Sequence, residues 1–329
     1  QFAQQRHAHA GEEAQIPDLR NPISMFAFDL VQRIHRITPV TTTSLICTAL
    51  LSKFALTKRG IESDVADLMA LIESHKKDAL VDRGSPIGQS VQNALQLLTK
   101  AQVFIQQGDG LNAKYAISRE NYLPATYYAN MAVHHLFRRS FIELSLLKAQ
   151  DVPVEERQLA FWTDIMALRD LFKFEFFYSP KPQFTHEIEI DLHFIDHRWH
   201  HHLFEQGGDL HQLLAKQRLL VAPVLLFNYV EAYRVVAHGL QTWHTEQALD
   251  DAALLNFCLF LGEEMHWQGR IRRIEAVSKP FLQNGIRLAA NLGLMPTDTD
   301  PKKAEIAAFI ERLEDVAKRI NYLQGITLS

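Results

Sequence analysis

The stretch YLPATYYANMAVHHLFRRSFIELSLLKAQ, residues 122–150, has a mostly apolar body that carries an arginine pair at 138–139. Its apolar residues recur at three and four positions, which is the spacing of one face of an α-helix. The stretch therefore predicts one long helix. A helix of this length can organise a bundle of other helices around it.

Helical spacing continues on both sides of this stretch. Upstream, it predicts helices over 43–53, 60–77 and 85–102. The segment VFIQQGDGLNAKYAIS that follows places Gly-Asp-Gly between two strand-like runs, which predicts a β-hairpin. Three helices and a hairpin outline a winged helix. Downstream, the pattern predicts further helices, ending in the amphipathic tail PKKAEIAAFIERLEDVAKRINYLQGI.

The predicted fold class is mainly α, in three parts. These are an N-terminal linker and docking segment over 1–40, a winged-helix-like subdomain over 41–122, and a helical bundle over 123–329. The N-terminal segment lacks the apolar core of a signal peptide and an initiator Met, so we expect the chain to begin inside a longer gene product. The apolar runs at 219–227 and 254–261 are too short to span a bilayer, and no transmembrane helix is predicted.

Composition narrows the classes of partner. The chain has 329 residues, 47% of them hydrophobic, which is enough for a well-buried core. The net charge of -4 provides no overall field for nucleic acid, and binding to anionic lipid needs a local basic patch. Helix 86–101, the recognition-helix candidate, has only Lys100 as a basic residue. Cys47 and Cys258 lie in separate apolar stretches, which indicates buried thiols in a reducing compartment.

Five strings in one order carry a family resemblance. They are ITPVTTTSLICTALL, TYYANMAVHHLF, LRDLFKFEFFYSP, YVEAYRVVAHGL and AKRINYL. Over roughly residues 23–323 the chain resembles the carboxy-terminal region of bacterial membrane-associated glycerol-3-phosphate 1-O-acyltransferases. Enzymes of this family transfer an acyl chain from acyl-CoA or acyl carrier protein to the 1-hydroxyl of glycerol 3-phosphate, in phospholipid biosynthesis.

The resemblance also implies what the chain lacks. The acyltransferase domain of the family lies upstream of this region, and its motifs for the phosphate are not found here. We therefore expect a non-catalytic part without a cofactor, which supports that upstream domain at the cytoplasmic face of the inner membrane, as a peripheral protein. A winged-helix regulatory or nucleic-acid-binding protein stays open as the alternative.

The stretch HEIEIDLHFIDHRWHHHLFE, residues 186–205, raises two chemical hypotheses. His186 and Asp191 match the His-x-x-x-x-Asp signature of the family's active site, but five residues apart they point to different faces of a helix or a strand. The second hypothesis is a metal site formed by His193, His197 and His201, with Asp196 nearby. The alternative interpretation of the same residues is an ordinary amphipathic helix. On such a helix Leu192, Ile195, Trp199 and Leu203 are buried, and His200, His201 and His202 are mostly solvated. We expect no catalytic and no metal residue here.

Two groups of residues are candidates for contacts with partners. The first group is a candidate domain-docking surface and contains Tyr127, Tyr128, Asn130, His134 and His135. An equally favoured interpretation is that these are polar positions on a core helix. The second group is a candidate contact with lipid or a partner and contains Arg138, Arg139, Arg270, Arg272 and Arg273. The favoured interpretation is instead that these arginines lie at solvated helix ends. Phe172, Phe174, Phe176 and Phe177 are interpreted as core rather than as an acyl-chain groove.

Overall fold

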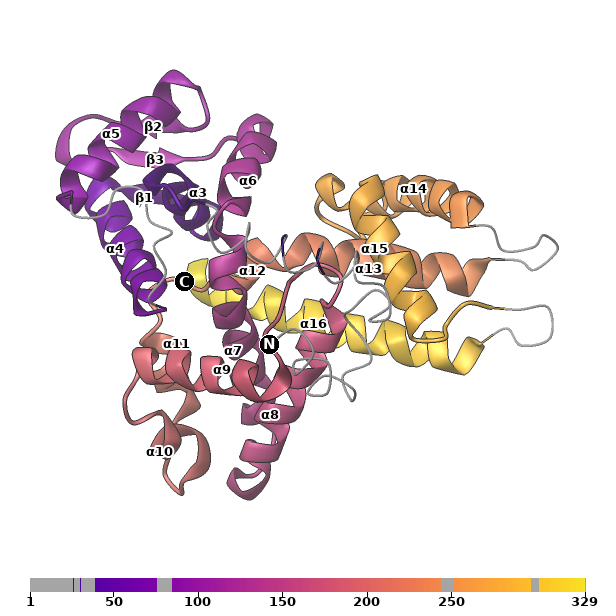
Figure 1. Cartoon of the computed structure of the whole chain (residues 1–329). Helices are drawn as coiled ribbons and strands as arrows, with labels where there is room; N and C mark the ends of the chain where they lie inside the picture. Colours follow the sequence, from indigo (N-terminus) through magenta and orange to yellow (C-terminus); the bar gives the residue numbers. More distant parts are fainter. Residues whose placement is uncertain are drawn as a thin grey trace.

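The computed structural model describes Phe26, Leu30 and residues 39–75, 85–243, 251–296 and 302–328. The predicted N-terminal segment over 1–40 lies almost entirely outside these ranges. The described chain is mainly helical with one small sheet (Figure 1), which confirms the predicted fold class. None of the helices in these ranges combines the length and the apolar character needed to cross a bilayer.

The first part of the described chain packs three helices against a three-stranded sheet. The elements are α3 (Thr42–Ser52), β1 (Ala55–Thr57), α4 (Lys58–Ser74), α5 (Ile87–Lys100), β2 (Ile105–Gln107), η1 (Gly110–Asn112) and β3 (Lys114–Ala116). The strands are antiparallel in the order β1-β3-β2, so β2 and β3 form the predicted hairpin. The sequence did not predict β1, because three residues between two helices are too few to show a period of two. The arrangement is compatible with a winged helix.

The predicted single helix over 122–150 is wrong: the segment forms two helices. After η2 (Arg119–Asn121) come α6 (Tyr122–Asn130) and α7 (Val133–Gln150). At the break, the backbone N–H of Met131 donates to Tyr128 at 3.2 Å and that of Ala132 to Ala129 at 3.0 Å, three residues back instead of four. This tighter turn lets α6 pack on α3 while α7 packs on α8.

The rest of the described chain is helical. The elements are α8 (Val154–Leu171), α9 (Lys181–Ile195), α10 (Trp199–Phe204), α11 (Leu210–Ala215), α12 (Ala222–Leu225), α13 (Phe227–Thr242), α14 (Asp251–Trp267), η3 (Ile274–Ala276), α15 (Lys279–Asn291) and α16 (Lys303–Leu328). In Figure 1, α7 runs through the middle of the molecule; α9 and α11 lie beside its lower part, and α8 and α10 reach below it. Helices α13, α14 and α15 project to the right together with the first half of α16.

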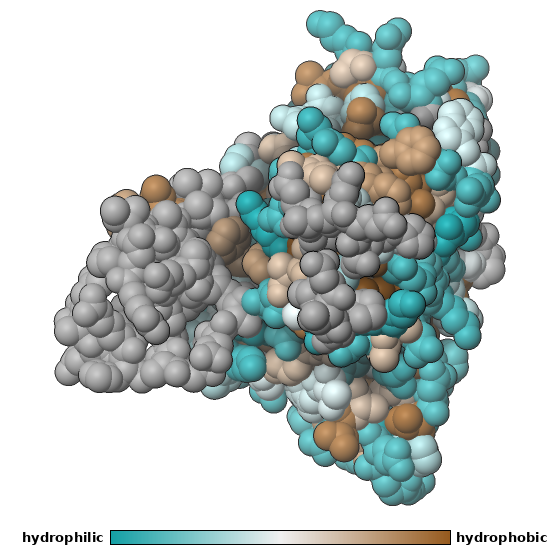
Figure 2. Space-filling model, turned by 90° about the vertical axis from the view of Figure 1, so that its right-hand side faces the viewer, coloured by the Kyte–Doolittle hydropathy of each residue, from teal (hydrophilic) through white to brown (hydrophobic). Residues whose placement is uncertain are grey.

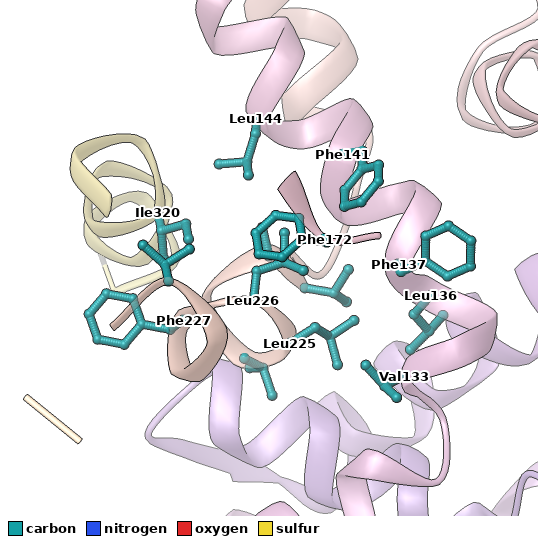
Figure 3. Packing of buried hydrophobic residues seen from close by; sticks show 14 of the residues in the cluster. Val133, Leu136, Phe137, Phe141, Leu144, Phe172, Leu225, Leu226, Phe227 and Ile320 are labelled. Atoms are coloured by element: carbon teal, nitrogen blue, oxygen red, sulfur yellow. The ribbon is translucent and has the colours of Figure 1, made fainter. Parts of the chain in front are cut away.

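The core is centred on α7 and the short helix α12. Figure 3 shows Phe141 of α7 facing Phe172, with Leu225 and Leu226 beside them. Ile320 of α16 closes the cluster on the other side, and all of these side chains are at most 4% exposed. Burying each such side chain stabilises the fold by roughly 1.5–3 kcal/mol. The hydroxyl of Ser52 in α3 donates to the carbonyl of Leu220 at 2.8 Å, which ties the first part of the chain to this core.

Candidate functional site

The structure separates the two residues of the His-x-x-x-x-Asp signature. His186 on α9 is 72% exposed, and its Nδ1 lies 3.6 Å from Glu189. Asp191 is 1% exposed and turns inward, where it binds Arg138 and His75. A general base needs its orienting carboxylate within hydrogen-bond distance, so His186 and Asp191 do not form such a pair.

The histidines after Asp191 do not gather around a cation site. His193, His197 and His201 are all exposed, and His201 Nδ1 lies 2.9 Å from Glu205. Among residues 39–75, 85–243, 251–296 and 302–328, no group of three or more His, Cys, Asp or Glu side chains could hold a metal ion.

The prediction that His202 is solvated is wrong. His202 is 4% exposed, with its Nε2 3.1 Å from Asp196 Oδ2. The prediction assumed one continuous helix, but α9 ends at Ile195, the backbone of Asp196 is extended, and α10 begins at Trp199. Burial would raise the pKa of Asp196, but hydrogen bonds from Lys216 and from the backbone N–H of Arg198, together with the charge of Lys216, lower it to about 2. Asp196 therefore fixes the turn between the two helices.

Arg138 is the centre of a buried ion-pair network. Its Nε donates to Asp191 Oδ2 at 2.7 Å, and its Nη1 donates to Glu187 at 3.1 Å. His75, at the end of α4, places its Nε2 2.5 Å from Asp191 Oδ1. Burial would raise the pKa of Asp191, but Arg138 and His75 hold it below its ordinary value. The network joins α4, α7 and α9.

Arg139 belongs to a second buried network. Its Nη1 donates to Asp67 at 2.8 Å and its Nη2 to the carbonyl of Leu219 at 2.9 Å. Glu143, one turn further along α7, is fully buried, and burial raises its pKa to about 7. Its carboxylate accepts the backbone N–H of Ala222 at 2.8 Å and that of Val221 at 2.9 Å, at the start of α12.

These networks correct the interpretation of the arginine pair. Arg138 and Arg139 are 6% and 2% exposed, so neither lies at a solvated helix end. Their guanidinium groups form ion pairs with carboxylates of this chain, and neither is placed to contact a lipid surface. The sequence did not show this because the partner Asp191 lies 53 residues from Arg138.

Part of the predicted docking surface is exposed on α6. Tyr127 is 73% exposed and Leu123, one turn earlier, is 62% exposed. Asn130 is exposed as well, and Tyr128 and His134 are half-buried. His135 is 4% exposed and belongs to the interior, as the core alternative predicted. We call the exposed residues Leu123, Tyr127 and Asn130 the α6 surface.

The downstream arginines are divided between surface and interior. Arg270 and Arg272 are exposed, in the connection between α14 and α15. Arg273 is half-buried, and its guanidinium stacks 5.1 Å from the rings of both Tyr122 and Phe227. Arg273 therefore links this connection to the start of α6.

The phenylalanines after α8 are largely core, as predicted. Phe172 and Phe176 are 0% and 3% exposed and pack in a cluster of aromatic rings, whereas Phe174 and Phe177 are half-buried. Beside them, Glu175 accepts a hydrogen bond from the hydroxyl of Tyr233 at 2.7 Å. Burial raises the pKa of Glu175 to about 7.

Comparison with known proteins identifies the family. A family model described as "Glycerol-3-phosphate acyltransferase C-terminal region" matches residues 1–298. The chain belongs to this family. The chain is also similar to proteins of Mycobacterium tuberculosis and Mycobacterium bovis, each named "Putative acyltransferase plsB1", with 26% identity over 311 residues. The match covers 91% of this chain and 49% of each relative, so the chain spans about half the length of the curated relatives it matches.

Membership of the glycerol-3-phosphate acyltransferase C-terminal region family agrees with the resemblance seen in the five strings. The comparisons give no support to a regulatory or nucleic-acid-binding protein. Sequence reasoning missed several residues that the structure makes prominent, namely His75, Leu123, Glu143, Glu231 and Trp267. Trp267 had a usable signal, because a tryptophan that ends an apolar helix directly before a run of arginines is unusual in a core.

Proposed function

We propose that this chain is the C-terminal, non-catalytic part of a glycerol-3-phosphate 1-O-acyltransferase. The whole enzyme would transfer an acyl group from acyl-CoA or acyl carrier protein to glycerol 3-phosphate. The task of this part is to dock on the upstream catalytic domain and support it, as a peripheral protein on the cytoplasmic face of the membrane. Family membership, together with a match to only half the length of the relatives, favours a supporting part.

The observation that carries the docking proposal is the α6 surface. Residues 121–137, NYLPATYYANMAVHHLF, contain no Asp, Glu, Lys or Arg, although α6 is exposed along one side. The centres of protein interfaces are depleted of charged residues and enriched in aromatic ones. Tyr127 is of a residue type that often contributes much of the binding energy when it fills a pocket on a partner.

The ionisable residues of the chain fit a supporting role. Arg138, Arg139, Asp191 and Glu143 hold helices and backbone N–H groups of this chain in place. Such groups stabilise the fold and leave His186 without the carboxylate that the family signature requires. The positively charged phosphate pocket that glycerol 3-phosphate needs is therefore expected on the catalytic domain.

Acylation assays in which this chain and the upstream domain are produced as separate proteins test this proposal. We would measure acyl-CoA-dependent acylation of glycerol 3-phosphate by this chain, by the upstream domain of the full-length enzyme, and by both together. The chain alone gives no lysophosphatidic acid, and its addition stabilises the upstream domain or raises its activity. Tyr127→Ala weakens this effect, whereas Leu159→Ala, an equally exposed apolar residue on α8, does not. Turnover by the chain alone that His186→Ala abolishes would overturn the proposal.

A further inference from the structure

The end of α14 forms a sharp, fixed turn. The helix ends at Trp267, and Gly269 adopts a φ of +71°, a left-handed conformation that suits glycine. The backbone N–H groups of Arg270 and Ile271 both donate to the carbonyl of Met265, at 2.8 Å and 3.3 Å. Met265 and Ile271 are buried, so the turn is anchored in the protein interior.

Three side chains point outward from this turn. Trp267 is 86% exposed, which is the largest exposed fraction among the large apolar side chains of the described residues. Arg270 and Arg272 are exposed, and neither guanidinium has a carboxylate partner in the part of the chain that the structure describes. We call Trp267, Arg270 and Arg272 the α14 tip.

A buried carboxylate sets the backbone of the α14 tip. Glu231 is fully buried and accepts the backbone N–H of Arg272 at 2.6 Å and that of Arg273 at 2.9 Å. The side chain of Arg273 turns inward to the rings of Tyr122 and Phe227, while that of Arg272 turns outward. The backbone of the tip is thus preorganised, and little backbone entropy is lost when the tip binds a partner.

The charge around the tip is opposite to that of the whole chain. From Trp267 to Lys279, four basic residues and one acidic residue, Glu275, give a net charge of +3 in a chain of -4. Glu263 and Glu264 are exposed one turn earlier on α14, on the same face as Trp267, and they reduce the net charge to +1 over residues 263–279. Tryptophan prefers the headgroup level of a bilayer, and arginine binds phosphate through paired N–H groups. The tip therefore complements an anionic phospholipid surface.

We propose that the α14 tip is the membrane contact of this chain, with Trp267 entering the headgroup layer and Arg270 and Arg272 binding lipid phosphates. The proposal rests on the peripheral membrane location in the proposed function and names the surface responsible. Arg273 contributes to the position of the tip without touching lipid. Because Arg273 stacks on Tyr122, the tip borders the α6 surface, which would bring a docked catalytic domain close to the membrane.

Vesicle co-sedimentation of the 329-residue chain tests the proposal. We would compare vesicles of phosphatidylcholine with vesicles that also contain phosphatidylglycerol, using the variants Trp267→Ala, Arg270→Ala and Arg272→Ala. Matched controls are Leu159→Ala on α8 and Arg198→Ala directly before α10, both at exposed positions outside the tip. Because the tip side chains are exposed, all variants keep the melting temperature of the parent chain.

The expected result is binding to the anionic vesicles only, weakened by added salt. Each arginine substitution lowers the affinity about fivefold, equivalent to about 1 kcal/mol per arginine near an anionic surface. Trp267→Ala lowers it at least as much, and the two controls leave it unchanged. Absence of binding by the parent chain, or equal binding by the tip variants, overturns the proposal.

A docking assay separates this proposal from the proposed function. If Trp267→Ala abolishes docking on the upstream domain and leaves vesicle binding intact, the tip belongs to the protein interface, and the membrane proposal is wrong. If the chain fails to dock at all but its tip variants lose vesicle binding, the membrane contact stands and the supporting function fails.

Discussion

Helices α7 and α14 have similar lengths, but the rest of the chain covers nearly all of α7 and only part of α14. Apart from His134, Lys148 and Gln150, every residue of α7 is buried, including two arginines and a glutamate. α14 is richer in apolar residues, yet only Leu254, Cys258, Gly262 and Met265 are buried. Figure 2 views the side on which α14 and α15 project, and brown hydrophobic residues interrupt the teal surface there.

This comparison shows that composition alone does not decide which helix becomes the core. The charges of α7 are buried because partners on other helices satisfy them, as Asp191 does for Arg138. The apolar residues of α14 stay partly exposed because only one stripe of the helix meets α13 and α15. The exposed side of α14 is mixed, because Phe260 and Trp267 lie there beside Asn256, Glu263 and Glu264.

The largest expected effect comes from breaking the network of α7. Arg138→Ala leaves the carboxylate of Asp191 buried with only His75, and we expect a loss of about 3–5 kcal/mol in the free energy of unfolding. Urea denaturation measures it. The control is Arg218→Ala, which removes a mostly exposed partner of Asp64 and costs about 0–1 kcal/mol. Similar losses for the two variants would contradict the role of the buried network.

A pH effect is expected from the carboxyl group of Glu175. Because the pKa of Glu175 is about 7 in the folded chain and ordinarily 4.5, folding favours its protonated form. This contribution is fully present below pH 4.5 and is lost as the pH rises to about 7. Glu175→Gln keeps the acceptor for Tyr233 and reduces the loss of stability between about pH 5 and pH 8, by on the order of 2 kcal/mol. Identical pH profiles for the variant and the parent chain would rule out this assignment.

A smaller effect on stability is expected at the buried stripe of α14, which contains Leu254, Cys258, Gly262 and Met265. A methyl group at Gly262 would lie 2.8 Å from Val277, so Gly262→Ala overpacks the contact and destabilises the chain by about 1–2 kcal/mol. At Gly325 in α16 an added methyl group meets nothing within 4 Å, and Gly325→Ala is neutral or stabilising by up to about 1 kcal/mol. Thermal unfolding of both variants decides whether α14 is packed on that side.

The smallest effect on stability is expected on the outer side of α14. Phe260 and Trp267 are 58% and 86% exposed, so replacement of either by Ala changes the free energy of unfolding by at most about 0.5 kcal/mol. Chemical denaturation measures this change. A loss comparable to that of Gly262→Ala would mean that these side chains pack within the chain, and the contrast between α7 and α14 would disappear.

The sequence predicted local structure better than long-range pairing. Apolar spacing located α3, α4, α5 and α16 to within a few residues, because their periodicity is a local property. The break at Met131 was not visible, since neither Gly nor Pro marks it and its cause is the packing of α6 on α3. The burial of Arg138 depends on Asp191, a partner whose proximity no local pattern reveals. Tyr127 was named because it lies in one of the five strings that carry the family resemblance, and only the structure showed that it is exposed.

Amide hydrogen exchange of the chain, alone and bound to the proposed upstream catalytic domain, tests the proposed docking role most directly. We predict that the domain slows exchange in α6 around Tyr127, while α7 is already protected in the free chain. Slowed exchange in α9 or α10 without any change in α6 would contradict the account, because the docking surface would then lie on the histidine-rich side of the molecule.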